Sequence, residues 1–283
     1  MWIAFQGEPG AYSEAAARRL VPDAETVPCQ SFEDVFAAVA AGRVSRGIVP
    51  MENSIGGSIH RNYDLLLEHD LHIVAEVELD VDHCLLARPG ATATALKVVY
   101  SHPQALAQCE QYLRRFEGVE IVAVYDTAGS AKMVAESGRT DAGAIASRRA
   151  GELFGLEVLA EAIQDFASNI TRFVVIGRAP APEAEATKTS LVFTTSSTPG
   201  SLFKALSCFA LRDINLSKLE SRPIRGRAWE YMFYVDVDAA RHAPSCARAI
   251  THLGEVAKWV RVLGSYRAWG ASASAEQALS MLP

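Results

Sequence analysis

The sequence predicts an α/β protein in two parts, and three observations support this prediction. Short apolar runs alternate with Gly-rich loops and helix-forming segments through residues 1–178, as in a sheet covered by helices. Residues 179–188 are rich in Pro, Ala and Glu and predict a linker. Beyond the linker, the segments follow the order strand, helix, strand, strand, helix, strand, which is the ferredoxin-like βαββαβ plan.

Composition sets limits on the class of protein. The chain has 283 residues, 49% of them hydrophobic and 21% charged, as expected of a globular protein. The net charge of −6 gives no general attraction for nucleic acid or for an anionic membrane. The five cysteines are scattered without a CxxC pair, which favours a reducing compartment over disulfides or a thiolate metal site. The chain opens on a strand-like segment rather than a signal peptide, so we expect a cytoplasmic protein.

The first part begins with a strand at 2–5, a loop containing Gly7 and Gly10, and a helix at 11–20. A strand, a Gly-rich loop and a helix together direct backbone N–H groups at an anion. The chain lacks GxGxxG and a Walker lysine, which disfavours a dinucleotide or a nucleoside triphosphate.

The remaining elements of the first part follow from apolar runs and helix-start signals. Strands are expected at 26–29, 46–50, 71–81, 84–87, 98–100, 119–125, 142–146 and 157–163, and helices at 31–41, 59–67, 101–108, 128–137 and 148–154. Ser31 and Asp34 form a start that resembles a capping box. Ser101 and Gln108 are about two helical turns apart and are expected on one helix face. The loop at 51–58, which contains Glu52 and Asn53, is expected to lead to a second helix N-terminus, that of the helix at 59–67.

The second part is compact. Its strands are expected at 189–194, 215–220, 229–237 and 260–266, with helices at 199–211 and 245–253. No role is predicted for the tail at 271–283.

A polar stretch before the last strand of the first part carries the chemistry. Asn169, Thr171 and Arg172 precede an apolar run, at the kind of sheet edge where open α/β proteins bind ligands. An amide, a hydroxyl and a cation suit a small anion with a leaving oxygen. A strand cap with an Arg salt bridge explains the same residues, and both interpretations stay open. His69 and His72 lack a third metal ligand, and no nucleophile elbow is present.

Six motifs occur in a characteristic order: FQGEPGAYS at 5–13, PMENSIGG at 50–57, SHPQ at 101–104, GAIAS at 143–147, NITRF at 169–173 and ESRP at 220–223. Together they resemble the prephenate dehydratase family with its C-terminal ACT regulatory domain. The resemblance implies a two-lobed, periplasmic-binding-protein-like catalytic domain in residues 1–178. Lobe one would contain about 1–75 and 160–178, and lobe two about 76–159. An ACT domain would occupy 189–270.

The resemblance also implies an activity. The family converts prephenate to phenylpyruvate for phenylalanine biosynthesis, losing carbon dioxide and water, without a cofactor or a metal. Thr171 would protonate the departing hydroxyl, as expected of general acid catalysis. The other catalytic residues that the resemblance implies are Glu52, Asn53, Ser101 and Gln108. The substrate-binding residues expected beside them are Ala11, Tyr12, Ser13, Asn169, Arg172 and Phe173.

Regulation by an aromatic amino acid, with L-phenylalanine as the expected effector, is implied by the same resemblance, as is a homodimer or homotetramer. The effector-binding residues would be Gly200, Ser201, Leu202, Asn215, Glu220, Ser221, Arg222 and Pro223. Ser201 and Phe203 depart from the family's Gly-Ala-Leu-Val pattern. Two alternatives remain: an arogenate dehydratase acting on the amino analogue of prephenate, and a non-catalytic amino-acid sensor.

Overall fold

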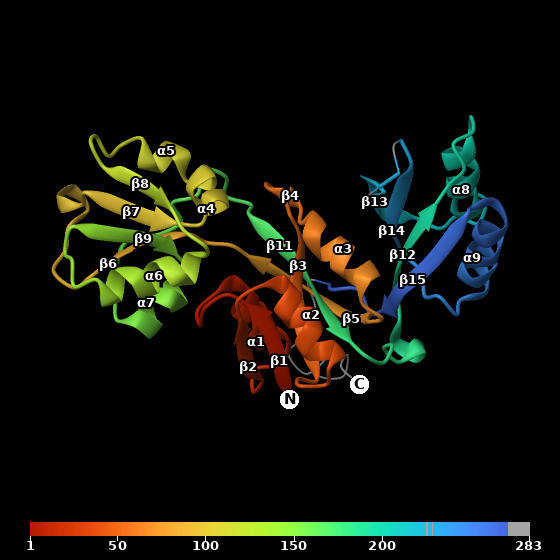
Figure 1. The fold of residues 1–283 in the computed structure, drawn as a ribbon, viewed down its shortest axis with the longest axis horizontal. Helices are drawn as coiled ribbons and strands as arrows, with labels where there is room; N and C mark the ends of the chain where they lie inside the picture. Colours follow the sequence, from red (N-terminus) through yellow and green to blue (C-terminus); the bar gives the residue numbers. More distant parts are fainter. Residues whose placement is uncertain (225, 228, 271–283) are drawn as a thin grey trace. The chain divides into compact units, whose positions relative to one another are not determined.

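The computed structural model describes residues 1–224, 226–227 and 229–270 (Figure 1). The chain divides into two compact units. The first contains residues 1–67 and 77–174, and the second contains residues 68–76 and the described residues from 175 onward. No helix in the described ranges is long and apolar enough to cross a membrane. The limits of the lobes, the linker and the ACT domain expected from the sequence stay predictions.

The first unit contains most of a sheet with the strand order β2-β1-β3-β11-β5, and β4 pairs with β3. Its strands are β1 (Trp2–Gln6), β2 (Glu25–Cys29), β3 (Arg46–Asn53), β4 (Gly57–Ser58), β5 (His72–Asp80) and β11 (Ile170–Gly177). Its helices are α1 (Tyr12–Leu20), α2 (Phe32–Ala40) and α3 (His60–Glu68). Strand β1 runs parallel to β2 and β3. This arrangement brings the ends of β1 and β3, with their following loops, to one edge of the sheet.

A second sheet in the first unit has the order β10-β6-β9-β7-β8. Its strands are β6 (Cys84–Ala87), β7 (Val98–Ser101), β8 (Glu120–Ala123), β9 (Ala142–Ala146) and β10 (Glu157–Ala160). Its helices are α4 (Pro103–Gln108), α5 (Glu110–Leu113), α6 (Thr127–Glu136) and α7 (Arg148–Phe154), with a 3₁₀ turn, η1 (Ala93–Ala95). In Figure 1, α4 and α5 lie on one side of this sheet and α6 and α7 on the other. All of β6 and β9 is buried, as expected of central strands covered on both faces.

One expectation about a helix start in the first unit is wrong. Ser101 ends strand β7, and helix α4 begins only at Pro103, so Ser101 and Gln108 do not share a helix face. The loop after Asn53 turns at Gly57, which adopts a φ of 77°, and the chain pairs back with β3 as the short strand β4 before the expected helix begins. Helix α3 starts at His60. The capping box of α2 is confirmed, because Ser31 and Asp34 each accept a hydrogen bond from the other's backbone N–H.

The second unit contains a four-stranded sheet in the order β13-β14-β12-β15. Its elements are η2 (Glu183–Glu185), β12 (Lys188–Thr194), α8 (Ser201–Ala210), β13 (Leu216–Pro223), β14 (Tyr231–Val237), α9 (Pro244–Val256) and β15 (Trp259–Tyr266). All of the pairings are antiparallel. Numbered along the chain, this order is 2-3-1-4, the ferredoxin-like arrangement. The core lies between this sheet and helices α8 and α9, where Leu191, Phe193 and Phe209 are fully buried. The α/β fold class expected from the sequence is confirmed.

A buried ion pair ties residues 68–76 to the sheet of the second unit. Lys188 Nζ lies 2.6 Å from Glu76 Oε1, and the backbone N–H of Trp269 donates to the same oxygen. The Glu76 side chain is only 1% exposed. Removing the partner of such a charge typically costs about 3–5 kcal/mol. A chain cut before Lys188 loses both of these contacts to Glu76.

None of the five cysteines is paired in a disulfide, and only Cys29 is not buried. Burial raises the pKa of each of the other four thiols.

The loop after β1 approaches helix α7 closely at Gly10. Its φ of 92° is in the region that favours glycine, and a Cβ at this position would lie 2.8 Å from the Ala150 Cα in α7. The Ser147 hydroxyl also donates to the Gly10 carbonyl at 2.7 Å. A side chain at position 10 therefore has no space.

We expect Gly10→Ala to destabilise the first unit more than Gly138→Ala. Both glycines have positive φ, so both substitutions cost about 1–2 kcal/mol in backbone conformation. Only Gly10 adds a steric collision, because nothing lies within 4 Å of a Cβ at Gly138. Denaturant unfolding of both variants measures the difference, and equal losses would contradict the close approach.

Candidate active site

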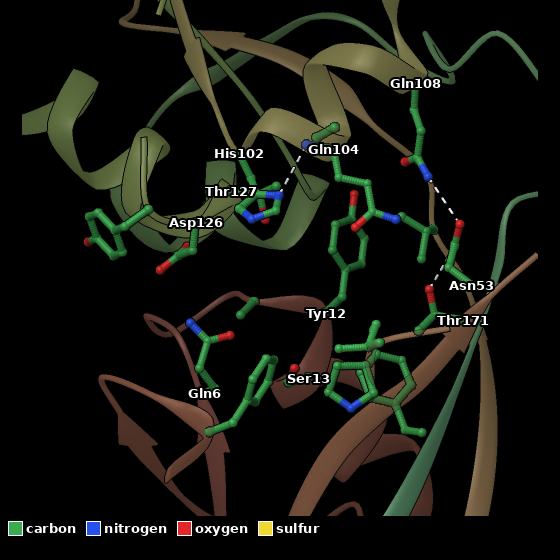
Figure 2. Close-up of a pocket in the computed structure, with 18 of the residues that line it drawn as sticks. Gln6, Tyr12, Ser13, Asn53, His102, Gln104, Gln108, Asp126, Thr127 and Thr171 are labelled. Atoms are coloured by element: carbon green, nitrogen blue, oxygen red, sulfur yellow. Dashed lines mark hydrogen bonds between the residues drawn. The ribbon is translucent and has the colours of Figure 1, made fainter. Parts of the chain in front are cut away.

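A cavity of about 470 Å³ lies in the first unit, among residues from both of its sheets (Figure 2). This volume is typical of a site for a small molecule. The expected site residues that line it are Ala11, Tyr12, Ser13, Asn53, Gln108, Thr171 and Phe173. The other expected catalytic or substrate-binding residues, which do not line it, are Glu52, Ser101, Asn169 and Arg172.

Asn53, the last residue of β3, has an unambiguous amide orientation. Its Oδ1 accepts hydrogen bonds from the backbone N–H groups of Ile55 at 3.1 Å and Gly56 at 2.7 Å. Its Nδ2 must therefore point the other way, where it donates to Asn169 Oδ1 at 2.6 Å and Thr171 Oγ1 at 2.9 Å. The turn after β3 thus orients the amide that contacts Thr171.

Gln108, the last residue of α4, is oriented by Asn53 in turn. Its Nε2 donates to Asn53 Oδ1 at 3.1 Å, so its Oε1 faces Asn169 Nδ2 at 3.1 Å and His83 Nε2 at 2.9 Å. Because that oxygen only accepts, His83 Nε2 carries a proton. Burial lowers the pKa of His83, more than the Gln108 hydrogen bond raises it, so the ring is neutral near pH 7. Its Nδ1 lies 3.0 Å from the Tyr12 hydroxyl.

Thr171 has a hydroxyl proton available for a ligand. Its Oγ1 accepts from Asn53, and no acceptor for its own proton is found among the residues that the structure describes. The side chain is 7% exposed and lines the cavity. Figure 2 shows Asn53 and Gln108 beside Thr171 on one side of the pocket. The network therefore engages one lone pair of the hydroxyl and leaves its proton for a ligand oxygen.

The N-terminus of helix α1 offers neutral donors for a carboxylate. Ala11 is the N-cap and supplies no side-chain acceptor, so the first-turn N–H groups of Tyr12 and Ser13 have no cap. These three residues line the cavity. A helix N-terminus with free N–H groups favours an anion.

Glu52 and Arg172 pair with each other rather than facing the cavity. Arg172 Nε lies 2.7 Å from Glu52 Oε1, and the Arg172 residue is only 8% exposed. The salt-bridge interpretation of Arg172 therefore describes this structure. A role for either residue in catalysis or substrate binding stays a prediction.

Ser101 and Asn169 lie outside the cavity lining. The Ser101 hydroxyl donates to the Ile145 carbonyl at 2.6 Å and is fully buried. Asn169, the residue directly before β11, is hydrogen-bonded to both Asn53 and Gln108 and so stabilises the network. Neither residue reaches the cavity wall, and their functional assignment remains a prediction.

Several residues that line the cavity were not predicted as site residues from the sequence, among them His83, Gln104 and Asp126. Asp126 follows strand β8 and caps helix α6 with a 2.6 Å bond from the Gly129 N–H. The sequence contained a signal for Asp126, because a polar residue between an expected strand and an expected helix lies at the sheet edge where ligands bind. His102, which caps α4, accepts from the Gln104 N–H through Nδ1 at 3.2 Å. Burial lowers the pKa of His102.

The expected effector residues all belong to the second unit. Gly200 caps α8 with a φ of 76°, and Ser201 and Leu202 begin that helix. Asn215 donates to Asp238 Oδ2 at 2.6 Å. The remaining four, Glu220, Ser221, Arg222 and Pro223, lie on β13, an edge strand of the sheet.

Comparison with known proteins identifies the family. Residues 3–181 match the family model described as prephenate dehydratase. "Arogenate dehydratase/prephenate dehydratase 1, chloroplastic" of Arabidopsis thaliana is 49% identical over 93% of this chain and 71% of its own length.

Two solved structures are similar over most of this chain. The Arthrobacter aurescens prephenate dehydratase in complex with L-Phe has a TM-score of 0.86 and 30% identity, covering 98% of this chain and 91% of its own. GqqA, titled a novel type of quorum quenching acylase, has a TM-score of 0.87 and 39% identity, covering 95% and 98%. This likeness confirms the two-lobed, periplasmic-binding-protein-like architecture followed by a ferredoxin-like domain.

The comparisons also correct one expectation and settle another. The expected cytoplasmic location is contradicted, because similar Arabidopsis relatives are named chloroplastic. The interpretation as a non-catalytic sensor gives way to an enzyme, since the relatives are named dehydratases, which are carbon–oxygen lyases. The chain belongs to the prephenate dehydratase family.

Proposed function

We propose that the chain removes water and carbon dioxide from prephenate or from its amino analogue arogenate, with Thr171 as the proton donor to the departing hydroxyl. The observation that carries the proposal is the Thr171 hydroxyl, whose oxygen accepts from Asn53 while its proton remains available to the cavity. Both substrates appear in the names of the relatives. They share the ring, the ring carboxylate and the leaving hydroxyl, so one donor serves either.

The proposed reaction requires mainly that the substrate is held with its leaving hydroxyl beside a hydrogen-bond donor. The ring carbon–oxygen bond breaks, the bond to the ring carboxylate breaks, and that electron pair completes the aromatic ring. Hydroxide is a poor leaving group, so a hydrogen bond from Thr171 stabilises it as it departs, and solvent then completes its conversion to water. The high pKa of a threonine hydroxyl keeps this donation partial. The neutral donors at the N-terminus of α1 suit a substrate carboxylate.

Apolar lining residues help the decarboxylation. Val81, Ala105 and Phe173 line the cavity and are buried. A carboxylate next to such surfaces loses part of its hydration, which favours its departure as neutral carbon dioxide.

Regulation by L-phenylalanine through the second unit is part of the proposal. The ferredoxin-like sheet has an exposed-edge strand, β13, that carries the ESRP motif, and the L-Phe complex of a relative gives the ligand class. Edge strands pair readily with a second copy, which agrees with an assembly of identical chains. Linkage requires the effector to bind two states of the enzyme unequally.

Thr171→Ala should lower kcat by about 10²- to 10⁴-fold and leave KM nearly unchanged, because the proposed contact with the substrate that it removes is donation to the leaving oxygen. Thr171→Ser keeps the hydroxyl and should lose much less. Steady-state kinetics with both substrates and thermal unfolding of both variants give the answer. An Ala variant that folds normally and turns over at the wild-type rate would remove Thr171 from the mechanism.

Asn53→Asp tests the orientation of that hydroxyl at almost constant shape. A carboxylate still accepts from Ile55, Gly56 and Gln108, but it no longer donates to Thr171 and instead captures its proton. We expect kcat to fall on the scale of a lost general acid, about 10²-fold or more. Activity should recover partly as the pH falls, since a protonated carboxyl again donates. A pH-independent loss would contradict this account.

Saturating L-phenylalanine should change the dehydratase rate of the full chain and raise its Tm. A ligand at 100 times its Kd stabilises the state that it binds by about 2.7 kcal/mol. D-phenylalanine is the matched control. If the L enantiomer alters neither rate nor Tm, phenylalanine is not the effector. The full chain is used, because a truncation before Lys188 removes two of the groups that bind Glu76.

A further inference from the structure

Asp126 carries a buried carboxylate oxygen that the capping of α6 does not use. Its Oδ1 accepts from the Gly129 N–H at 2.6 Å, which satisfies the role of an N-cap. Its Oδ2 is buried without a hydrogen-bond partner among the described residues, and the residue is 8% exposed. Asp126 lines the cavity, and Figure 2 shows it across the pocket from Thr171, with Tyr12 between them. The cap explains an Asp, Asn or Ser equally well, but it does not explain a second, unpaired oxygen.

The surroundings of Asp126 favour a cation. Burial raises the pKa of Asp126, and the nearby Glu8 carboxylate raises it further. The backbone N–H groups of Gly129, Glu8 and Ala128 oppose the rise, but none of them makes a hydrogen bond of ordinary geometry to Oδ2. Glu8 itself is paired with Lys132 at 3.1 Å and accepts from the Tyr125 hydroxyl at 3.3 Å. The Lys132 charge is therefore already balanced by Glu8, and the carboxylate of Asp126 remains without a matching cation in this group.

The remainder of the cavity supplies no positive charge for a second substrate carboxylate. The described lining residues include no Lys or Arg. Burial lowers the pKa of both lining histidines, His83 and His102, and therefore favours their neutral forms. The other lining carboxylate, Glu33, is paired with Arg61 at 2.6 Å. Asp126 is thus the lining carboxylate whose charge a substrate group has to balance.

We propose that Asp126 binds the ammonium group of the substrate side chain and makes the chain prefer arogenate to prephenate. The inference rests on the proposed dehydratase function and names its substrate. An ammonium donates three hydrogen bonds and carries the charge that Oδ2 lacks. The keto group of prephenate only accepts, so it would face Oδ2 with two acceptors in contact. Prephenate also brings a net charge of −2 to this site, whereas arogenate brings −1.

The test compares kcat/KM for arogenate and prephenate in the wild type, Asp126→Asn and Asp141→Asn. Asn is as good an N-cap as Asp, so the first variant removes the charge and keeps the helix start. Asp141, paired with Arg139 outside the cavity lining, is the control for the same change of net charge. Asp126→Ser, which also caps, is the second variant if Asn impairs folding.

The wild type should prefer arogenate. Asp126→Asn should lower kcat/KM for arogenate by about 10- to 100-fold, the usual effect of losing a hydrogen bond between charged groups. Prephenate turnover should stay constant or rise, because a repulsive charge is removed, and Asp141→Asn should alter neither.

Two outcomes overturn the inference and leave the proposed function intact. One is a wild type that turns over prephenate but not arogenate, and the other is an Asp126→Asn variant that loses both activities by the same factor. A wild type that converts neither substrate refutes the proposed function together with the inference.

Discussion

The active-site geometry depends on the orientation of one side-chain amide. Two backbone N–H groups in the turn after β3 fix the position of the Asn53 side-chain oxygen. The orientations of the polar side chains that hydrogen-bond to Asn53, directly or through Gln108, follow from it. Gln108 must present its nitrogen to Asn53, His83 must carry its proton on Nε2, and Thr171 must accept from Asn53. A buried network in which each donor meets an acceptor holds a single arrangement, because any flipped amide places like groups in contact. The Thr171 hydroxyl, the proposed proton donor, is therefore oriented in the absence of a ligand.

Charge imposes the second constraint. In the proposed function, an anionic substrate meets neutral donors at the N-terminus of α1 and in the amide network, because the described lining residues include no Lys or Arg. Neutral donors stabilise a carboxylate without holding it as strongly as an ion pair would. That difference suits a reaction in which a carboxylate has to lose its charge. Arg172, the cation that the sequence placed beside Thr171, is occupied by Glu52.

The sequence predicted local features better than those set by contacts between distant segments. The bounds of β6, β9 and α7 agree to the residue, because apolar runs and a clear cap at Ser147 mark their ends. The short strand β4 was not predicted, because its two residues form a strand only by pairing with β3. Spacing also placed Ser101 on a helix that starts two residues later.

Within the site, motif resemblance found Thr171, Asn53 and Gln108, but it did not find Asp126. Its capping role is readable from neighbouring residues, whereas its unpaired oxygen depends on how distant segments bury it.

The state of the cysteines has a consequence for how the enzyme responds to oxidants. Thiol exchange and oxidation proceed through the thiolate, and burial keeps Cys84, Cys109, Cys208 and Cys246 protonated and shielded. Cys29, the remaining cysteine, also has its pKa raised, chiefly by burial. A protein with this pattern lacks the accessible, low-pKa thiol that a redox sensor requires. We therefore expect its activity not to depend on the thiol potential of its compartment.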